Sequence, residues 1–308
     1  MLRIGIVRGG QQDLFASSVT HGSRVFSHLD TEHFEPHDVL ISDGIWHLDG
    51  VPRTPLFIAT SLDVLYNALH ESDPENSTLD ELVTRHNARV VNVAHRLDHD
   101  MEHMQITAKM HGIEAPAMHA YTFPDTLKTK AQIAHVAEDV AFDLFRKLPP
   151  AWYVFGPSTL RYQVGDTAKS FHELVDHVKT IFAEHDHVYI TDDHGGRDVF
   201  VFVVRDFRHE SLYAFLPVER IVTAKGETYV LMRDKTYSTQ LTEHAKKMHE
   251  SMHMGTHGLY HYAITRRGML CIDVIYRPIF SEGGIIEKSL EEHGVSPSSF
   301  LAFVAGIA

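Results

Sequence analysis

Residues 2–10, LRIGIVRGG, decide the fold of this chain. Apolar side chains dominate the first seven of them, which predicts a short buried strand, and the glycine pair closes that strand. Helical spacing follows over residues 17–29, and two further strands are predicted over residues 38–41 and 63–68. Because strands that alternate with helices form a mostly parallel sheet covered on both faces, we predict that the chain begins with an α/β domain.

Strand and helix signals also alternate along the rest of the sequence. They predict helices over residues 98–112, 170–184 and 239–254, strands over residues 45–48, 151–155, 188–190, 199–205, 258–264 and 269–275, and a closing helix from Ser298. No repeat, low-complexity tract or long linker separates these elements. We therefore expect an α/β (α+β) protein whose lobes pack closely against one another.

The length and charge of the chain limit its class. Its 308 residues suffice for two or three lobes, since single cores stop growing at roughly 250 to 300 residues. The apolar fraction of 44% and the charged fraction of 22% are ordinary for a globular protein. The formal net charge of −13, from 28 basic and 41 acidic residues, repels phosphate backbones and anionic lipids, so neither nucleic acid nor a membrane is an expected partner.

Cysteine usage and hydropathy indicate the compartment. The single cysteine, Cys271, cannot form an internal disulfide, and its place in the apolar run 269–274 predicts a buried structural thiol. No apolar run approaches the roughly 20 residues that a membrane span requires. Residues 1–4 lead directly into the first strand and leave no room for a signal peptide, so we expect a cytoplasmic protein.

Histidine is the one compositional oddity, with 25 residues. Many lie at positions predicted to be solvated: His28, His33, His37, His99, His103, His185, His187, His249 and His253. The sequence contains no HExxH motif and no Cys/His zinc spacing. His249 and His253 are spaced i, i+4 on a predicted helix and could hold a metal ion, but a surface position is the favoured interpretation. The histidines then predict a change of charge between about pH 5 and 7.

Three segments, residues 4–10, 38–47 and 63–70, together resemble the N-terminal domain of D-alanine:D-alanine ligases in order and in spacing. The match extends over essentially the whole chain, and it implies the three-lobed ATP-grasp architecture. The implied lobes are an N-terminal pre-ATP-grasp domain with a parallel sheet, a central ATP-grasp lobe and a C-terminal ATP-grasp lobe, over residues 1–97, 98–185 and 186–308.

The resemblance also implies a reaction. In active ligases of this family, nucleotide lies between the central and C-terminal lobes, and two magnesium ions neutralise its phosphates. A D-alanine carboxylate is phosphorylated, and the amine of a second D-alanine attacks the resulting acyl phosphate. Such chemistry needs cations where negative charge accumulates and carboxylates that hold the metal ions.

The implied substrate site is incomplete. The family's glutamate, which orients the first substrate amine, is replaced by Ala16, so an ammonium group would lose its anionic partner. His70 is retained, and Glu75 is the residue kept from the acidic loop that follows it in relatives. His70 and Glu75 are therefore the substrate-binding residues that the resemblance implies, although His70 could equally cap the end of a strand.

The implied nucleotide site has lost its lysines. One position is Gly156, and no lysine lies between Asp98 and Ala108. The small-residue phosphate loop of the family reads RYQVG over residues 161–165, where bulky side chains obstruct close approach of backbone N–H groups to phosphate. Arg161 could supply a positive charge there, and Asp198 conservatively replaces the ribose-binding glutamate. The closing loop that shields the acyl phosphate from water is also shortened.

The implied metal site is altered most. Leu259 replaces an arginine that stabilises the oxyanion, and Ile275 replaces an asparagine that binds Mg²⁺. His261 and Asp273 remain as weak metal-ligand candidates, but hard cations prefer several oxygen ligands. A softer metal ion at these two residues is conceivable.

Three functions remain open from the sequence. The favoured one is a degenerate pseudoenzyme, retained for binding or assembly, because compensation for so many lost groups is improbable. The alternative is an active ATP-dependent carboxylate-amine ligase, with ATP and Mg²⁺, that makes D-alanyl-D-alanine for peptidoglycan or a related dipeptide. A structural subunit with no ligand is the third. The resemblance implies a homodimer through the N-terminal domain, and a pseudoenzyme would have a further protein partner.

Overall fold

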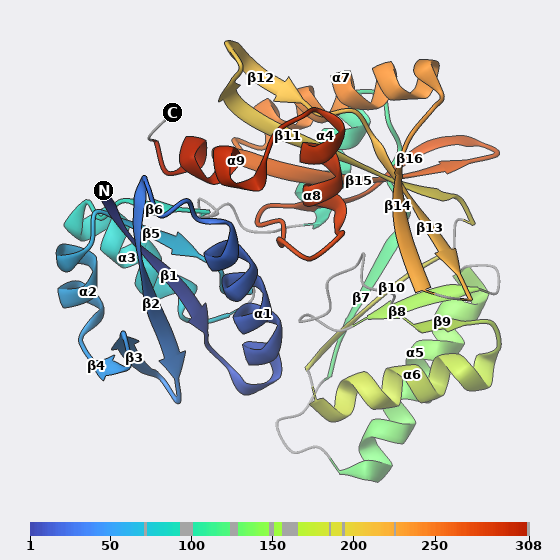
Figure 1. Cartoon of the computed structure of the whole chain (residues 1–308). Helices are drawn as coiled ribbons and strands as arrows, with labels where there is room; N and C mark the ends of the chain where they lie inside the picture. The colour runs from blue at the N-terminus through green and yellow to red at the C-terminus, as the bar shows by residue number, and fades with distance from the viewer. Residues whose placement is uncertain are drawn as a thin grey trace.

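The computed structural model describes residues 1–70, 73–92, 101–123, 129–147, 151–155, 166–184, 186–192, 195–224 and 226–306. Within these ranges the strands form three separate sheets, of six, four and six strands. Figure 1 shows the N-terminal domain on the left, the four-stranded sheet with its two helices at the lower right, and the third sheet above it. The α/β class and the three-lobed arrangement predicted from the sequence are confirmed.

The N-terminal domain is built on a mostly parallel sheet in the order β4-β3-β2-β1-β5-β6. β1 pairs in parallel with β2 and β5, and β5 pairs in parallel with β6. Every residue of β5 is buried, as expected for a strand covered on both faces. The elements are β1 (Leu2–Gly9), α1 (Gln12–His28), β2 (Phe34–Ser42), β3 (Ile45–Leu48), β4 (Val51–Pro52), α2 (Pro55–Ser61), β5 (Val64–Asn67), α3 (Asn76–His86) and β6 (Val90–Val91).

The central lobe carries an antiparallel sheet in the order β7-β10-β8-β9, packed against two helices. Its elements are β7 (Met118–Thr122), α5 (Lys130–Lys147), β8 (Trp152–Phe155), β9 (Asp166–Ala168), α6 (Phe171–Glu184) and β10 (His187–Asp192). Trp152 and Phe182 are fully buried between sheet and helices. The expected boundary at residue 185 would assign β10 to the C-terminal lobe. In the structure β10 lies between β7 and β8, in the sheet of the central lobe.

The C-terminal lobe is organised by a second antiparallel sheet, in the order β14-β13-β11-β15-β16, with β12 also paired to β11. α4 and α7 cover one face of it, and their apolar side chains pack with Val201 and Tyr262. The elements are α4 (Met101–Met110), β11 (Arg197–Phe207), β12 (Glu210–Ala214), β13 (Val218–Thr223), β14 (Gly226–Leu231), α7 (Lys235–Ser251), β15 (His257–Thr265), β16 (Gly268–Ile275), α8 (Ile285–Glu292) and α9 (Pro297–Val304).

The opposite face of this sheet joins the N-terminal domain through one continuous apolar core. Ile6 and Tyr66 of the N-terminal sheet belong to the same cluster as Phe202, Leu259 and Phe300. Ion pairs reinforce the contact at its edge. On α8, Glu287 accepts hydrogen bonds from Arg24 at 2.6 and 2.9 Å, and it lies 3.1 Å from His28. The N-terminal domain is therefore fixed against the C-terminal lobe.

Two sequence-based expectations are corrected. His249, expected to be solvated, is completely buried, and His253 lies beyond the end of α7 with a φ of 49°. The two imidazoles therefore do not share a helix face, because the helix ends at Ser251. Four helices, α2, α3, α5 and α8, were not predicted from the sequence. Cys271 is buried as predicted, and none of the helices described above is long and apolar enough to cross a membrane.

Candidate functional site

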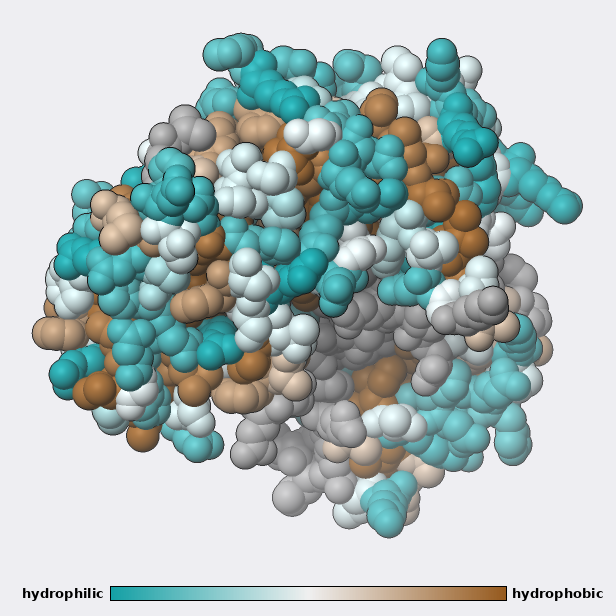
Figure 2. Space-filling model, in the orientation of Figure 1, coloured by the Kyte–Doolittle hydropathy of each residue, from teal (hydrophilic) through white to brown (hydrophobic). Residues whose placement is uncertain are grey.

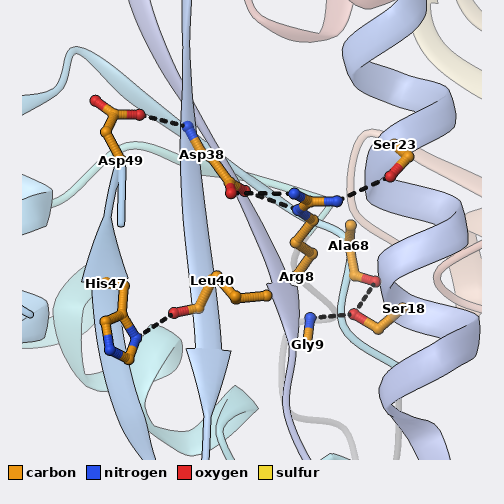
Figure 3. A network of polar contacts seen from close by, with 9 residues as sticks. All are labelled: Arg8, Gly9, Ser18, Ser23, Asp38, Leu40, His47, Asp49 and Ala68. Atoms are coloured by element: carbon orange, nitrogen blue, oxygen red, sulfur yellow. Dashed lines mark hydrogen bonds and ion pairs between the residues drawn. The ribbon is translucent and has the colours of Figure 1, made fainter. Parts of the chain in front are cut away.

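The carboxyl ends of the parallel strands meet the start of α1 at the glycine turn. The Gly9 amide donates to Ser18 Oγ at 2.9 Å, and Ser18 donates to the Ala68 carbonyl at 3.0 Å (Figure 3). Beside them, Arg8 donates to both carboxylate oxygens of Asp38, at 2.7 and 3.0 Å. Ligands of open α/β sheets bind outside the carboxyl ends of the strands, so this edge is the first place to seek a site.

A side chain of the protein itself occupies the turn. Asp73 accepts from the backbone amides of Gln11 and Glu75, each at 2.9 Å. Gly10 has a φ of 93°, and a Cβ there would lie 2.0 Å from Asp73 Oδ2. The amides at the start of α1 would suit an external anion, but the Asp73 carboxylate already binds there.

His70 lines a small cavity between this edge and the C-terminal lobe. The other lining residues are Ser17, Ser18, His21, Ala68, Leu69, Arg277 and Ile279. The water-accessible volume is about 10 Å³, roughly that of a single water molecule, so an amino acid does not fit in this arrangement. Burial lowers the pKa of His21 to about 4, and the charge of Arg277 acts in the same direction.

The other residues expected at the substrate end lie apart from the cavity. Ala16 is exposed on α1 and is not among the lining residues. The Glu75 carboxylate accepts from Trp46 Nε1 at 3.0 Å and from the Thr78 hydroxyl at 3.2 Å. Only His70 of the predicted substrate-binding pair therefore faces the cavity.

Arg277 lines this cavity and supplies its positive charge, but it was not predicted as a site residue from the sequence. Arg277 is 6% exposed and donates to the Asn76 side-chain carbonyl, which also accepts from Asn67 at 2.9 Å. The N-terminal domain thus supplies the acceptor and the C-terminal lobe supplies the donor. A long cationic side chain inside the apolar run 272–280 was the available signal.

The second candidate region lies on the C-terminal sheet. His261 Nε2 lies 2.8 Å from Asp198 Oδ1, and Arg220 donates to Asp198 Oδ2 at 2.6 Å. Burial opposes the charged form of Asp198, but the hydrogen bonds and charges of His261 and Arg220 prevail and hold the pKa of its carboxyl well below the usual range. The structure therefore brings together a residue expected to bind ribose and one expected to bind metal.

The neighbours of His261 complete this polar group. Its ring stacks on Phe200 with centroids 4.4 Å apart, and Asp273 is its partner across the β15–β16 pair. Asp273 Oδ1 accepts from the backbone amide of Val274 at 2.8 Å. Among the residues that the structure describes, no three His, Cys, Asp or Glu side chains are grouped so as to hold a metal ion.

The two positions at which the resemblance implies an oxyanion-stabilising group and a metal ligand, Leu259 and Ile275, lie in the apolar core. Leu259 is directly opposite both Phe202 and Ile275 in the sheet. Leu259 and Ile275 are each 2% exposed and pack in the cluster that also contains Phe300. This part of the sheet face is therefore occupied by hydrocarbon. In β10, Thr191 donates to the Ala117 carbonyl at 3.0 Å. Arg161 and the rest of the altered phosphate loop lie outside the described residues.

Comparisons with known proteins agree with this architecture. No family model matches the chain. A curated D-alanine–D-alanine ligase from Christiangramia forsetii is 24% identical over 235 residues, which span 71% of this chain and 68% of the ligase. A D-alanine–D-alanine ligase from Bacillus anthracis, crystallised with ATP, superposes with a TM-score of 0.75 at 14% identity, over 99% of this chain and 95% of its own. The D-Ala:D-Ser ligase VanG from Enterococcus faecalis gives 0.74 at 15% identity, over 99% of both chains.

The class of protein follows from these matches. The chain has the ATP-grasp fold. More particularly, it is similar in sequence and in architecture to D-alanine–D-alanine ligases, and the resemblance predicted from its sequence is confirmed.

Proposed function

We propose that this protein is a ligase-like ATP-grasp scaffold without ligase chemistry, a pseudoenzyme retained for binding or assembly. The observation that carries the proposal is the burial of Leu259 and Ile275 in the apolar core. An oxyanion-stabilising cation and a metal ligand would have to occupy these two positions. Loss of one oxyanion donor alone typically reduces the rate by about 10²- to 10³-fold, and the loss of metal ligands adds to this.

The polar residues that remain on the sheet support the same conclusion. Asp198 is already engaged by His261 and Arg220, so nucleotide hydroxyls would compete with two short, charge-assisted contacts. Asp273 and His261 together offer one carboxylate and one imidazole, whereas Mg²⁺ prefers octahedral oxygen coordination. Neither group suits Mg·ATP.

Calorimetric titration with Mg·ATP tests the proposal. We expect a dissociation constant weaker than about 1 mM, equivalent to less than roughly 4 kcal/mol of favourable free energy. The matched assay measures phosphate release that depends on D-alanine, with an active D-alanine–D-alanine ligase as positive control. Micromolar nucleotide binding would overturn the proposal. Any trace activity that persists in Asp273→Asn would indicate a contaminating ligase rather than this chain.

An active ligase with a rearranged site is the second candidate. The sequence similarity to a curated ligase favours it, and the buried Arg277 lines the same cavity as His70, although this cavity would have to widen to admit a substrate carboxylate. ATP and Mg²⁺ would then be required, and the product would be D-alanyl-D-alanine for peptidoglycan or a related dipeptide. Separation of the products by chromatography after incubation with D-alanine and Mg·ATP decides between the two candidates.

A homodimer through the N-terminal domain, in the cytoplasm, completes the proposal. Ile45, Val51, Leu56 and Phe57 on β3, β4 and α2 are between 43% and 52% exposed, and Figure 2 shows apolar surface over this part of the molecule. Burying such a patch would favour association. Phe57→Asp should convert a dimer to a monomer in light scattering, whereas Phe142→Asp, a control on α5 that is 55% exposed against 48% for Phe57, should not.

A further inference from the structure

A second cavity lies in the C-terminal lobe, and its lining includes none of the residues of the two candidate regions described above. It has a water-accessible volume of about 450 Å³, within the usual range of ligand pockets. Its walls are Arg205 and Asp206 at the end of β11, the segment 253–256 that joins α7 to β15, and Phe303 of α9. Val199, Val201 and Val203 pack against α4 and α7, and by strand alternation Arg205 shares their face. Asp198 and His261 lie on the other face.

The end of β11 places a carboxylate at the border of this cavity. Arg205 is opposite Leu212 and Phe207 is opposite Glu210, so β11 and β12 stay in register up to the turn that joins them. Asp206, between Arg205 and Phe207, has a φ of 54°, outside the range of a regular strand. Arg205 and Asp206 consequently both border one cavity, although they are adjacent in sequence.

Both of these charged side chains lack a partner among the residues that the structure describes. The backbone amide of Arg205 donates to the Thr256 carbonyl at 2.8 Å, but its half-buried guanidinium has no hydrogen bond or ion pair within those ranges. Its charge nevertheless acts inside the lobe: burial, and then the neighbouring Arg205, lower the pKa of His249 to about 4. Exposed Asp206 likewise has no ion pair there. A guanidinium without a protein partner at the border of a cavity is free to make a bidentate, charge-assisted contact with a ligand carboxylate.

The remaining lining is mixed, because Met254 and Phe303 are apolar whereas the exposed His253 and Thr256 are polar. Met254 is 4% exposed and Phe303 is half-buried, so Phe303 offers hydrocarbon surface beside the charged groups. A phosphate or other multiply charged anion suits it poorly, because a single guanidinium would be offset by the adjacent carboxylate. A molecule with one carboxylate and one ammonium group would satisfy both charges.

We propose that this cavity binds a small zwitterion, a free α-amino acid or a dipeptide with an apolar side chain. Arg205 receives the carboxylate in a bidentate contact, Asp206 receives the ammonium group, and Met254 and Phe303 contact the side chain. This cavity is separate from the two candidate regions of the preceding subsections. The proposal therefore does not depend on whether ligase chemistry was lost.

The test is calorimetric titration of the full chain with L-alanine and L-alanyl-L-alanine. N-acetyl-L-alanine, which lacks the ammonium group, and L-alaninamide, which lacks the carboxylate, are the matched ligands. Arg205→Met and Asp206→Asn are the matched variants, since asparagine tolerates the positive φ at position 206. Arg197→Met, an exposed arginine at the other end of β11, is the control, and thermal melting checks that each variant is folded.

We expect saturable binding at millimolar concentration or tighter, weakened at least about tenfold by either blocked ligand and by either variant, and unchanged in the control. Three results would overturn the proposal. They are the absence of saturable binding by either zwitterion, equal binding of N-acetyl-L-alanine, and binding that survives Arg205→Met. The last would place the ligand elsewhere on the protein.

Discussion

Acid pH should destabilise this protein well before its carboxylates are protonated. Among the buried histidines that the structure describes, four have pKa values lowered mainly by burial: His21, His244, His249 and His257. Burial is the main cause that lowers their pKa values, to about 4 for the first three and to about 3 for His257. Nearby positive charges add to the effect, from Arg277, from Arg205 and from other histidines. Each imidazole is therefore neutral in the folded protein at pH 7.

The sign and size follow from proton linkage. An unfolded histidine has a pKa near 6.5, so between about pH 6.5 and 4 the unfolded chain binds a proton that the folded chain excludes. Stability is thus fully present above pH 6.5 and falls by about 1.4 kcal/mol per pH unit for each group as the pH drops. At pH 5 each histidine contributes a loss of roughly 2 kcal/mol, and four together contribute about 4 to 8. A typical total stability is about 5 to 15 kcal/mol, so the effect is large.

Urea unfolding between pH 8 and 5 measures this, followed by fluorescence of Trp46 in the N-terminal domain and Trp152 in the central lobe. His249→Gln keeps a donor for the Gly255 carbonyl, which lies 3.1 Å from Nε2, and removes the titrating group. It should reduce the pH slope by about 1.4 kcal/mol per unit, whereas His86→Gln, at an exposed position on α3, should leave the slope unchanged. A stability that is constant from pH 7 to 5 would refute the reasoning.

Three substitutions test the packing of the two candidate regions by urea unfolding. Leu259→Arg buries an unpaired guanidinium in the apolar core and should lower the free energy of unfolding by about 3 to 5 kcal/mol. The control Leu259→Met should lower it by less than about 1.5 kcal/mol. A tolerated arginine would mean that the position is open to water. Asp198→Asn removes the carboxylate that lies between His261 and Arg220 and should lower the free energy of unfolding by about 2 to 3 kcal/mol. This is less than for a fully buried ion pair, because the Asp198 side chain is partly exposed. An unchanged free energy of unfolding would show that these contacts do not stabilise the fold. Gly10→Ala should cost at least about 2 kcal/mol because its Cβ would meet Asp73, whereas Gly44→Ala, also at positive φ but in open space, should cost about 1; equal costs would contradict the close packing.

Elements with a local signal could be predicted from the sequence. The strand over residues 2–8 and the following glycines appear as β1 (Leu2–Gly9) and its turn, because a run of apolar residues buried on both faces admits few alternatives. The strand over residues 258–264 also appears, as β15 (His257–Thr265). Helix ends were less accurate. α7 begins at Lys235 because Asp234 accepts from two amides of its first turn, a capping signal that the predicted start at residue 239 did not use.

The candidate site divides in the same way. That Ala16, Leu259 and Ile275 lack the expected groups is a matter of residue identity, which the sequence states directly. What replaces those groups could not be predicted. Asp198 meets a histidine 63 residues away and an arginine 22 residues away, and no periodicity connects such distant positions.

The sequence by itself thus determined several of the strands and helices and the resemblance to D-alanine–D-alanine ligases, and it showed which groups implied by that resemblance Ala16, Leu259 and Ile275 lack, since all of these depend on residue types and short spacings. Only the tertiary structure decided that His249 is buried, that Asp73 occupies the glycine turn and that Arg205 and Asp206 border one cavity. Each of these depends on long-range packing, where a turn or a crossover between lobes changes which side chains meet and how much water reaches them.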